Sequence, residues 1–224
     1  MHSVFASDFT PSPTGHSSGT LSNFGYSESD DLSAYEPPKP EKLVTRYYEL
    51  FHDAHPFLLP RRQLCNRLQK DPESLQHLFP VMELIGAIFM PEIARDPFQQ
   101  RAYNILNQSN LPLNGFTVQA LVLLSLALHC SDEYKLSEQF LEKAIDIALS
   151  INMHRQSFAV DNGEDDRSLE ESWRRTWWTL FLLDGLFAAI NHYPNHRLQG
   201  IEEEVDLPCE DWEYEKGASL ESFT

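Results

Sequence analysis

The stretch EESWRRTWWTLFLLDGLFAAINHYP, residues 170–194, concentrates large aromatic side chains in one apolar segment. Three of the chain's four tryptophans lie within six positions of this stretch. On a helix, one face would carry, in order, Trp173, Trp177, Phe181 and Asp184. The neighbouring Trp178 would point about 100° away from that face. Both faces then need packing neighbours, so the sequence predicts a central, Trp-rich helix inside an α-helical core.

Helical patterns continue on both sides of this stretch. Leu43, Tyr47, Leu50 and Phe51 recur at i, i+4, i+7 and i+8, which predicts a helix that ends before Pro56. Residues 74–94 are apolar on nearly all sides, as in a buried helix. Residues 117–131 and 135–154 predict an antiparallel helical hairpin. No segment alternates convincingly as a strand, so we expect an all-α, irregular multi-helix domain.

Composition divides the chain into three parts. Residues 1–40 are Ser- and Pro-rich and predict a disordered tail, residues 41–212 a helical domain, and residues 213–224 an acidic tail. The net charge of -17 and the pI of about 4.8 oppose direct binding to nucleic acid or to an anionic membrane. The three cysteines are widely spaced, which indicates reduced thiols and argues against a cysteine-based metal site.

Asp184 is the unusual residue of the tryptophan helix, because a buried carboxylate without a partner is costly. One interpretation is a buried ion pair or helix cap, with Arg155 as the partner. The other is a ligand contact or a general base. Ser168 and Glu171 have the spacing of a capping box that would start this helix. Arg174 and Arg175 lie one turn from the helix start, where we expect acids of the preceding loop or stacking on a tryptophan to hold them.

Several sequence elements resemble one known family. The segment YYELFHDAHPFLLP (47–60) contains His52, His55 and Pro56 in a pattern similar to YFxxFHxxHPFL. ALSINMHR (148–155) ends in Arg155, and EESWRRTWWTLFLLD (170–184) resembles the pattern E.RRRxWWxLFxLD. HYPNHRLQGIEEEVDLP (192–208) retains Pro194 but has His192 and Tyr193 where the pattern has Gly-Arg. In this order, the elements resemble the middle regulatory region of fungal zinc-cluster (Zn2Cys6) transcription factors.

The resemblance implies a helical regulatory domain of a nuclear transcription factor. Its motif residues would be His52, His55, Pro56, Arg155, Arg174, Arg175, Trp177, Trp178, Asp184 and Pro194. Family members carry zinc in a cluster of six closely spaced cysteines, which residues 1–224 do not contain. We therefore expect no cofactor in this chain and DNA contact only through a domain that is missing here. A truncated product and a family offshoot without the cluster both remain open.

The sequence offers few candidates for catalysis or for metal binding. His52 with His55, and His192 with His196, could each form a metal pair, but no third ligand has a suitable spacing. The sequence contains no GxSxG, P-loop or HExxH motif. The expectation is therefore a protein that is not an enzyme. The basic cluster, which comprises Arg61, Arg62, Arg67 and Lys70, is expected to form internal ion pairs.

The function expected from the sequence is control of RNA polymerase II transcription as the regulatory part of a transcription factor. Its expected partners are proteins of the transcription machinery or a co-regulator, and a small-molecule inducer. A ligand pocket would lie between helices near Trp173, Trp177, Phe181 and Asp184. The alternative function is a stand-alone helical interaction scaffold or partner-regulator that does not bind DNA. An enzyme would instead require turnover that Asp184→Asn abolishes without unfolding the protein.

Overall fold

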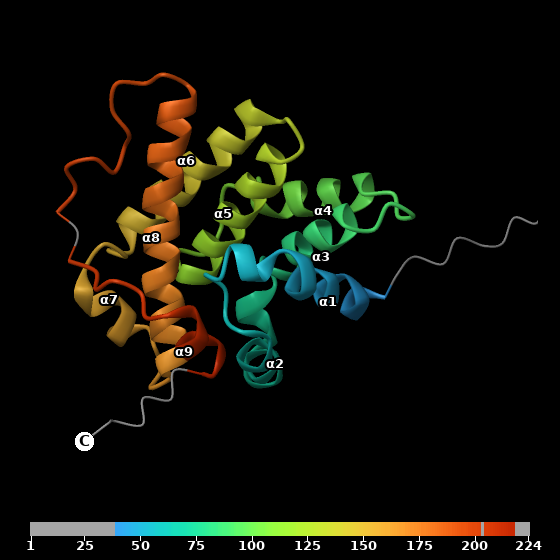
Figure 1. Cartoon of the computed structure of the whole chain (residues 1–224), viewed down its shortest axis with the longest axis horizontal. Coiled ribbons are helices and arrows are strands. Elements are labelled where there is room, and N and C mark those ends of the chain that lie inside the picture. The colour runs from blue at the N-terminus through green and yellow to red at the C-terminus, as the bar shows by residue number, and fades with distance from the viewer. Residues whose placement is uncertain (1–38, 203, 218–224) are drawn as a thin grey trace, which may run out of the picture. The chain divides into compact units, whose positions relative to one another are not determined.

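The computed structural model describes residues 39–202 and 204–217, and every described element is helical (Figure 1). The disordered tail predicted for residues 1–40 lies almost wholly outside the described residues. The α-helices are α1 (Pro40–Leu50), α2 (Arg61–Lys70), α3 (Phe79–Ile88), α4 (Asp96–Leu106), α5 (Gly115–His129), α6 (Tyr134–Ser150), α7 (Gln156–Asp161), α8 (Arg167–Ile190) and α9 (Asp211–Glu215). Two 3-10 helices, η1 (His52–Ala54) and η2 (Pro72–Leu75), complete the described elements. The prediction of an all-α fold is confirmed.

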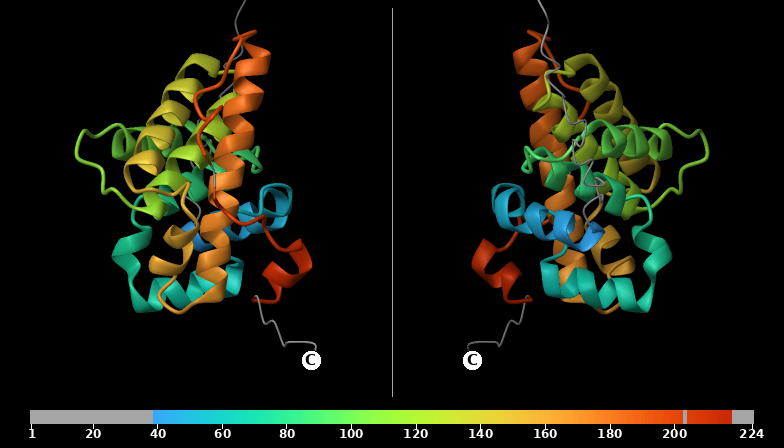
Figure 2. Two further views of the ribbon diagram at one scale, coloured as in Figure 1. Left: turned by 90° about the vertical axis from the view of Figure 1, so that its left-hand side faces the viewer. Right: turned by 90° about the vertical axis from the view of Figure 1, so that its right-hand side faces the viewer.

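Helix α8 is the Trp-rich helix, and it packs against α5, α6 and α7. Figure 2 shows the α5–α6 hairpin on one side of α8 and α9 on the other. Gln119 of α5 donates through its side-chain amide to the hydroxyls of Ser172 (2.9 Å) and Thr176 (2.8 Å) on α8. Because these groups are buried, their pairing holds α5 and α8 in one register.

The predicted α5–α6 hairpin is present, and its two helices pack closely. Helix α5 is buried along almost its whole length, since it lies between α6, α8, α3 and α4. Ser125 and Ser137 each donate a hydroxyl hydrogen bond to the other's backbone carbonyl, at 2.8 and 2.7 Å. The paired serines allow the helices to approach closely without leaving a buried hydroxyl unpaired.

Some local predictions differ from the structure. Leu50 is half exposed, and Tyr48 is buried in its place, because α1 packs mainly on α3 and presents a different arc from the one expected.

The capping box at Ser168 is wrong: α8 begins at Arg167, and its N-cap is Asp166, whose carboxylate accepts from the Ser168 N–H. Glu171 is thereby free to pair with arginines.

The predicted end of the helical domain at residue 212 falls inside α9. This short helix spans Asp211–Glu215, and its Tyr214 is fully buried. Tyr214 donates a hydrogen bond to the Leu58 carbonyl at 2.9 Å. The described residues just after position 212 therefore belong to the packed domain rather than to a tail.

The basic cluster of α2 forms ion pairs as predicted for two of its members. Arg67 pairs with Asp71 at 3.0 Å and with Glu164 at 2.6 Å, and Lys70 reaches the other oxygen of Glu164 at 2.8 Å. These pairs hold α2 beside the loop that precedes α8. Hydrogen bonds from Lys70 and Arg67 lower the pKa of Glu164.

Candidate functional site

Asp184, in the second half of α8, binds the segment that follows the helix. Its carboxylate accepts the backbone N–H of Leu198 at 2.7 Å and lies 3.0 Å from Nδ1 of His196. The Asp184 side chain is only 8% exposed, so both hydrogen bonds compensate for its burial. Asp184 therefore makes structural contacts of the kind expected for a buried carboxylate. The segment that it holds is a loop and not a second helix.

The predicted pairing of Asp184 with Arg155 is wrong. Arg155 instead pairs with Glu204 at 2.7 Å, in a half-exposed ion pair. The reason is topological: the chain reverses after α8, so the residues closest to Asp184 come from the returning segment. Arg155, at the N-cap of α7, meets the same returning segment further along.

Residues 191–202 and 204–210, which we call the return segment, run back along α8 (Figure 1). Several hydrogen bonds hold the return segment to the helix, and three of them show its course. The first is the Asp184–Leu198 bond; in the second, Trp178 Nε1 donates to the Asp206 carbonyl at 3.0 Å. In the third, the Cys209 N–H donates to Glu171 at 2.9 Å. The motif residue Pro194 lies exposed in this segment.

Arg175 is the most highly connected polar side chain of α8. It lies 2.9 Å from Glu171 and 2.6 Å from Asp211, and it donates to the carbonyls of Pro56 (3.2 Å) and Cys209 (2.7 Å). Its guanidinium also lies over the Tyr214 ring, 4.4 Å from the centroid. Arg175 is only 6% exposed, so it links the segment 47–60, which we call the opening element, to α8 and α9 within the core.

The neighbouring Arg174 has a more peripheral role. It reaches the second oxygen of Glu171 at 2.9 Å, and its side chain is a fifth exposed. Thus Glu171, which is almost fully buried, is held by both arginines. Acids do hold the two arginines, but they lie on α8 itself and on α9 rather than in the preceding loop, where they were expected. The stacking partner of Arg175 is a tyrosine rather than a tryptophan.

His52 connects the opening element to α9. Its Nε2 lies 3.0 Å from a carboxylate oxygen of Glu215, and its ring packs against Tyr48 at 4.8 Å between centroids. Burial lowers the pKa of His52, although the nearby Glu215 carboxylate opposes this shift. His55 stacks on Phe51 at 4.7 Å. Both histidines of the opening motif therefore make packing contacts.

Trp173 and Trp177 fill the core beside α8. Trp173 packs edge-on against Phe116, with ring centroids 4.8 Å apart, and donates its N–H to the Asn162 carbonyl at 2.9 Å. Trp177 is 0% exposed and lies 6.0 Å from the His154 ring. Phe181 is half-buried and packs against His196. Trp173, Trp177 and Phe181 thus each pack against another ring, and the predicted ligand pocket beside them stays a prediction.

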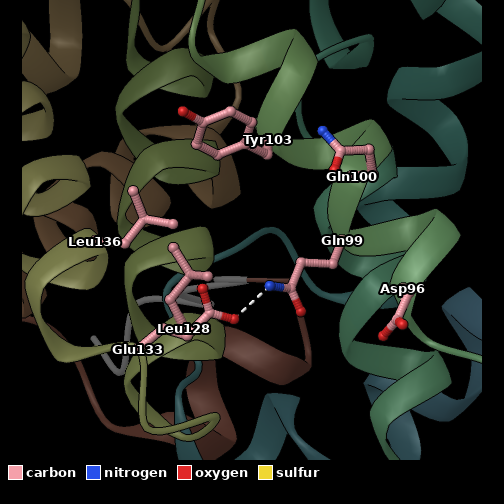
Figure 3. A pocket seen from close by; sticks show the side chains of 7 residues that line it. All are labelled: Asp96, Gln99, Gln100, Tyr103, Leu128, Glu133 and Leu136. Atoms are coloured by element: carbon pink, nitrogen blue, oxygen red, sulfur yellow. Dashed lines mark hydrogen bonds between the residues drawn. The ribbon is translucent and has the colours of Figure 1, made fainter.

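The larger described cavities lie away from the tryptophans. A cavity of about 80 Å³ reaches Asp184, which is too small for a typical ligand. A pocket of about 380 Å³ lies between α4, α5 and α6 (Figure 3), where the Gln99 amide hydrogen-bonds Glu133 across the opening. A groove of about 400 Å³ lies between α1, α2 and α3. Its apolar lining includes Val44, Leu64, Leu68 and Phe79.

The described residues do not suit a zinc cluster. Cys65, Cys130 and Cys209 are free thiols on separate segments. Within residues 39–202 and 204–217, no group of three or more His, Cys, Asp or Glu side chains could hold a metal ion. None of the described helices combines the length and apolar character needed to cross a membrane.

Comparison with known proteins identifies the family. The model of the fungal specific transcription factor domain matches residues 44–224. The C6 finger domain transcription factor iacK of Pestalotiopsis fici is 31% identical over 179 residues, which cover 79% of this chain and 26% of that protein. No solved structure matches the chain. The chain belongs to the fungal specific transcription factor domain family, a family of transcriptional regulators, and it spans about a quarter of this curated relative.

The contacts of α9 were missed at the level of sequence. Asp211 and Glu215 lie 36 and 163 positions from their partners Arg175 and His52, so no local periodicity connects them. A signal was present, because the sequence has an aromatic residue, Tyr214, within the segment predicted as an acidic tail. Glu171 was likewise assigned to a cap rather than to the arginines one turn later.

Proposed function

We propose that this domain controls RNA polymerase II transcription of target genes, as the regulatory part of a transcription factor. In this proposal, DNA is contacted by a zinc-cluster segment outside these 224 residues. The observation that supports it most directly is the family match over residues 44–224, together with the relative iacK, a C6 finger domain transcription factor by name. The nucleus is the corresponding site of action.

The regulatory mechanism in this proposal is non-catalytic. A partner protein or a small-molecule inducer binds the helical core and shifts which surfaces are exposed. The contacts of Arg175 and His52 with α9 are suited to such a shift, because each joins segments distant in sequence through a few polar bonds. A change in the docking of α9 would alter the acidic surface that it presents.

A reporter assay tests the transcriptional role. The full chain is tethered through a bacterial DNA-binding domain upstream of an RNA polymerase II promoter in a filamentous fungus. The proposal predicts a change in reporter output compared with the DNA-binding domain alone, and none at an RNA polymerase III promoter. An unchanged output at both promoters, with the fusion protein folded and nuclear, would contradict it.

Sequencing of the complete transcript separates this proposal from the scaffold alternative. An in-frame upstream segment with six closely spaced cysteines and a basic flank supports the DNA-binding factor. A reading frame that starts at Met1 favours a partner-regulator that does not read DNA itself.

The inducer is assigned to the groove between α1, α2 and α3 rather than to the tryptophan helix. The groove volume of about 400 Å³ is within the range of small-molecule sites, and its apolar floor with Arg61 and Thr45 at the rim suits an amphipathic compound. Thermal stabilisation by a panel of amphipathic metabolites tests this assignment. Cys65→Trp, which would fill the groove, should abolish the shift, whereas Cys130→Trp on another exposed surface should retain it.

A further inference from the structure

The outward face of α8 changes character along the helix. Arg175, Leu182 and Leu186 are related by i, i+7 and i+11, so they lie along one side of the helix. In the first half, this side is polar, and Arg175 binds the α9 segment there. From Leu182 onward, it carries apolar side chains, which we call the outer stripe: Leu182, Leu186, Ala189 and Ile190.

The outer stripe is bare in the described structure. Leu182, Leu186 and Ile190 are 67%, 51% and 49% exposed, and Ala189 is also exposed. The return segment covers the adjacent edge of the helix, where His196 packs on Phe181 and Asp206 meets Trp178. It leaves the stripe itself uncovered. A solvent-facing side of a helix normally carries polar residues, so this side has the character of an interface.

We infer that the outer stripe binds one amphipathic helix of a protein partner, with basic residues flanking its apolar face. The spacing of the stripe, i, i+4, i+7 and i+8 over two turns, matches the footprint of one helix packed along α8. The stripe also continues a side of α8 on which a helix of the same chain, α9, already docks.

Close approach is possible at Gly185, which lies beside the stripe. A Cβ atom built at Gly185 would meet no heavy atom nearer than 4.0 Å, where it reaches His196. The backbone of α8 is thus accessible at this point, and Ala189 follows one turn later with a small side chain. A partner helix could pack closely against this part of α8, as small residues allow at helix crossings.

Charge selects the flank of the partner helix. Between Arg197 and Lys216, the sequence has eight acidic residues and no lysine or arginine. Three of these acids, Glu204, Asp211 and Glu215, already pair within the chain, and the backbone carbonyl of Asp206 places this segment next to Trp178. A second copy of this chain fits less well, because each copy carries a net charge of -17.

Fluorescence anisotropy with the full chain and a labelled model peptide tests the inference. The probe is a helical peptide of about 18 residues with leucines at i, i+3, i+4 and i+7 and lysines elsewhere. Leu186→Glu should weaken its binding by about tenfold or more, as at the centre of an interface. Leu50→Glu, at an equally exposed leucine of α1, should retain it within about twofold, because it lies outside the stripe. A new glutamate strengthens the general attraction for a cationic peptide, so a loss of binding reports apolar contact.

Gly185→Ala provides a second variant that should not destabilise the folded protein. Its new methyl group meets open space within the chain, so the melting temperature should not fall while peptide binding weakens. Equal peptide binding by wild type, Leu186→Glu and Gly185→Ala would overturn the inference. A wild-type dimer that Leu186→Glu converts to a monomer would also overturn it, because the stripe would then bind a second copy.

Discussion

The carboxylate of Asp184 accepts the backbone N–H of Leu198 at 2.7 Å, and both groups are buried. This bond connects the second half of α8 to the loop that returns along it. A buried backbone N–H cannot recover a lost acceptor from water. The bond therefore determines where the return segment begins to follow the helix.

Asp184→Ala is expected to lower the free energy of unfolding by about 1–3 kcal/mol, because it leaves the Leu198 N–H without an acceptor. Urea denaturation of the purified chain measures the change. Asp146→Ala is the matched control: Asp146 pairs with Arg197 at 2.7 Å but is 65% exposed, so its loss should cost at most about 1 kcal/mol. Equal effects of the two substitutions would contradict a special role for Asp184.

Arg175→Gln should destabilise the protein by about 3 kcal/mol, the scale for removing one member of a buried ion pair. The variant leaves Glu171 with Arg174 and the Cys209 N–H, and it removes the ion pair that Arg175 makes with Asp211 of α9. Trypsin cleavage after the exposed Lys216 should accelerate as α9 detaches.

Arg174→Gln is the adjacent control for this prediction. Arg174 is a fifth exposed and contacts only glutamates of its own helix, so the cost should stay below about 1 kcal/mol. A larger effect of Arg174→Gln than of Arg175→Gln would show that the buried connections of Arg175 contribute little.

The helices and the burial of one side of α8 were predictable from sequence, because they depend on local spacing. The other side of α8 is exposed at Leu182 and Leu186, so the helix is not covered on both faces as predicted. Three tryptophans within six residues require packing on two sides, and Trp177 is accordingly fully buried. The hairpin of α5 and α6 followed from two apolar stripes joined by a short connector. Such features need no knowledge of distant residues.

The polar partners were not predictable in the same way. Asp184 was expected to bind Arg155, which lies on the preceding connection, but the chain reversal after α8 brings Leu198 to it. The Arg175–Asp211 and His52–Glu215 pairs depend on the docking of α9, which follows from tertiary packing. The exposure of Leu50 likewise reflects which helix covers α1, and periodicity within α1 leaves that open.

Two helical glycines should respond to alanine with opposite signs. At Gly86 of α3, an added Cβ would collide with the backbone carbonyl of Leu43 on α1, so Gly86→Ala should destabilise the protein by about 1–3 kcal/mol through overpacking. At Gly185, the space is open, so Gly185→Ala should stabilise it by up to about 1 kcal/mol through helix propensity. Thermal and urea unfolding of both variants measure the signs. Destabilisation of similar size at both positions would refute the close contact of α1 with α3.

Stability should fall as the pH drops below about 6.5, the ordinary pKa of histidine. Burial lowers the pKa of His52 in the folded protein, and it also lowers the pKa of His55, His77 and His154. Between the two pKa values, the unfolded chain binds more protons than the folded protein. The stabilising contribution of the neutral histidines is therefore complete above their pKa in the unfolded chain, and it declines as the pH falls toward their pKa in the folded protein. Urea titrations at pH 7.5 and 5.5 measure the difference.

His52→Gln should reduce the pH dependence, because one of the buried histidines is removed. Glu215→Gln should increase it, since the carboxylate that favours protonated His52 is lost. A pH dependence that neither substitution alters would exclude His52 as a contributor.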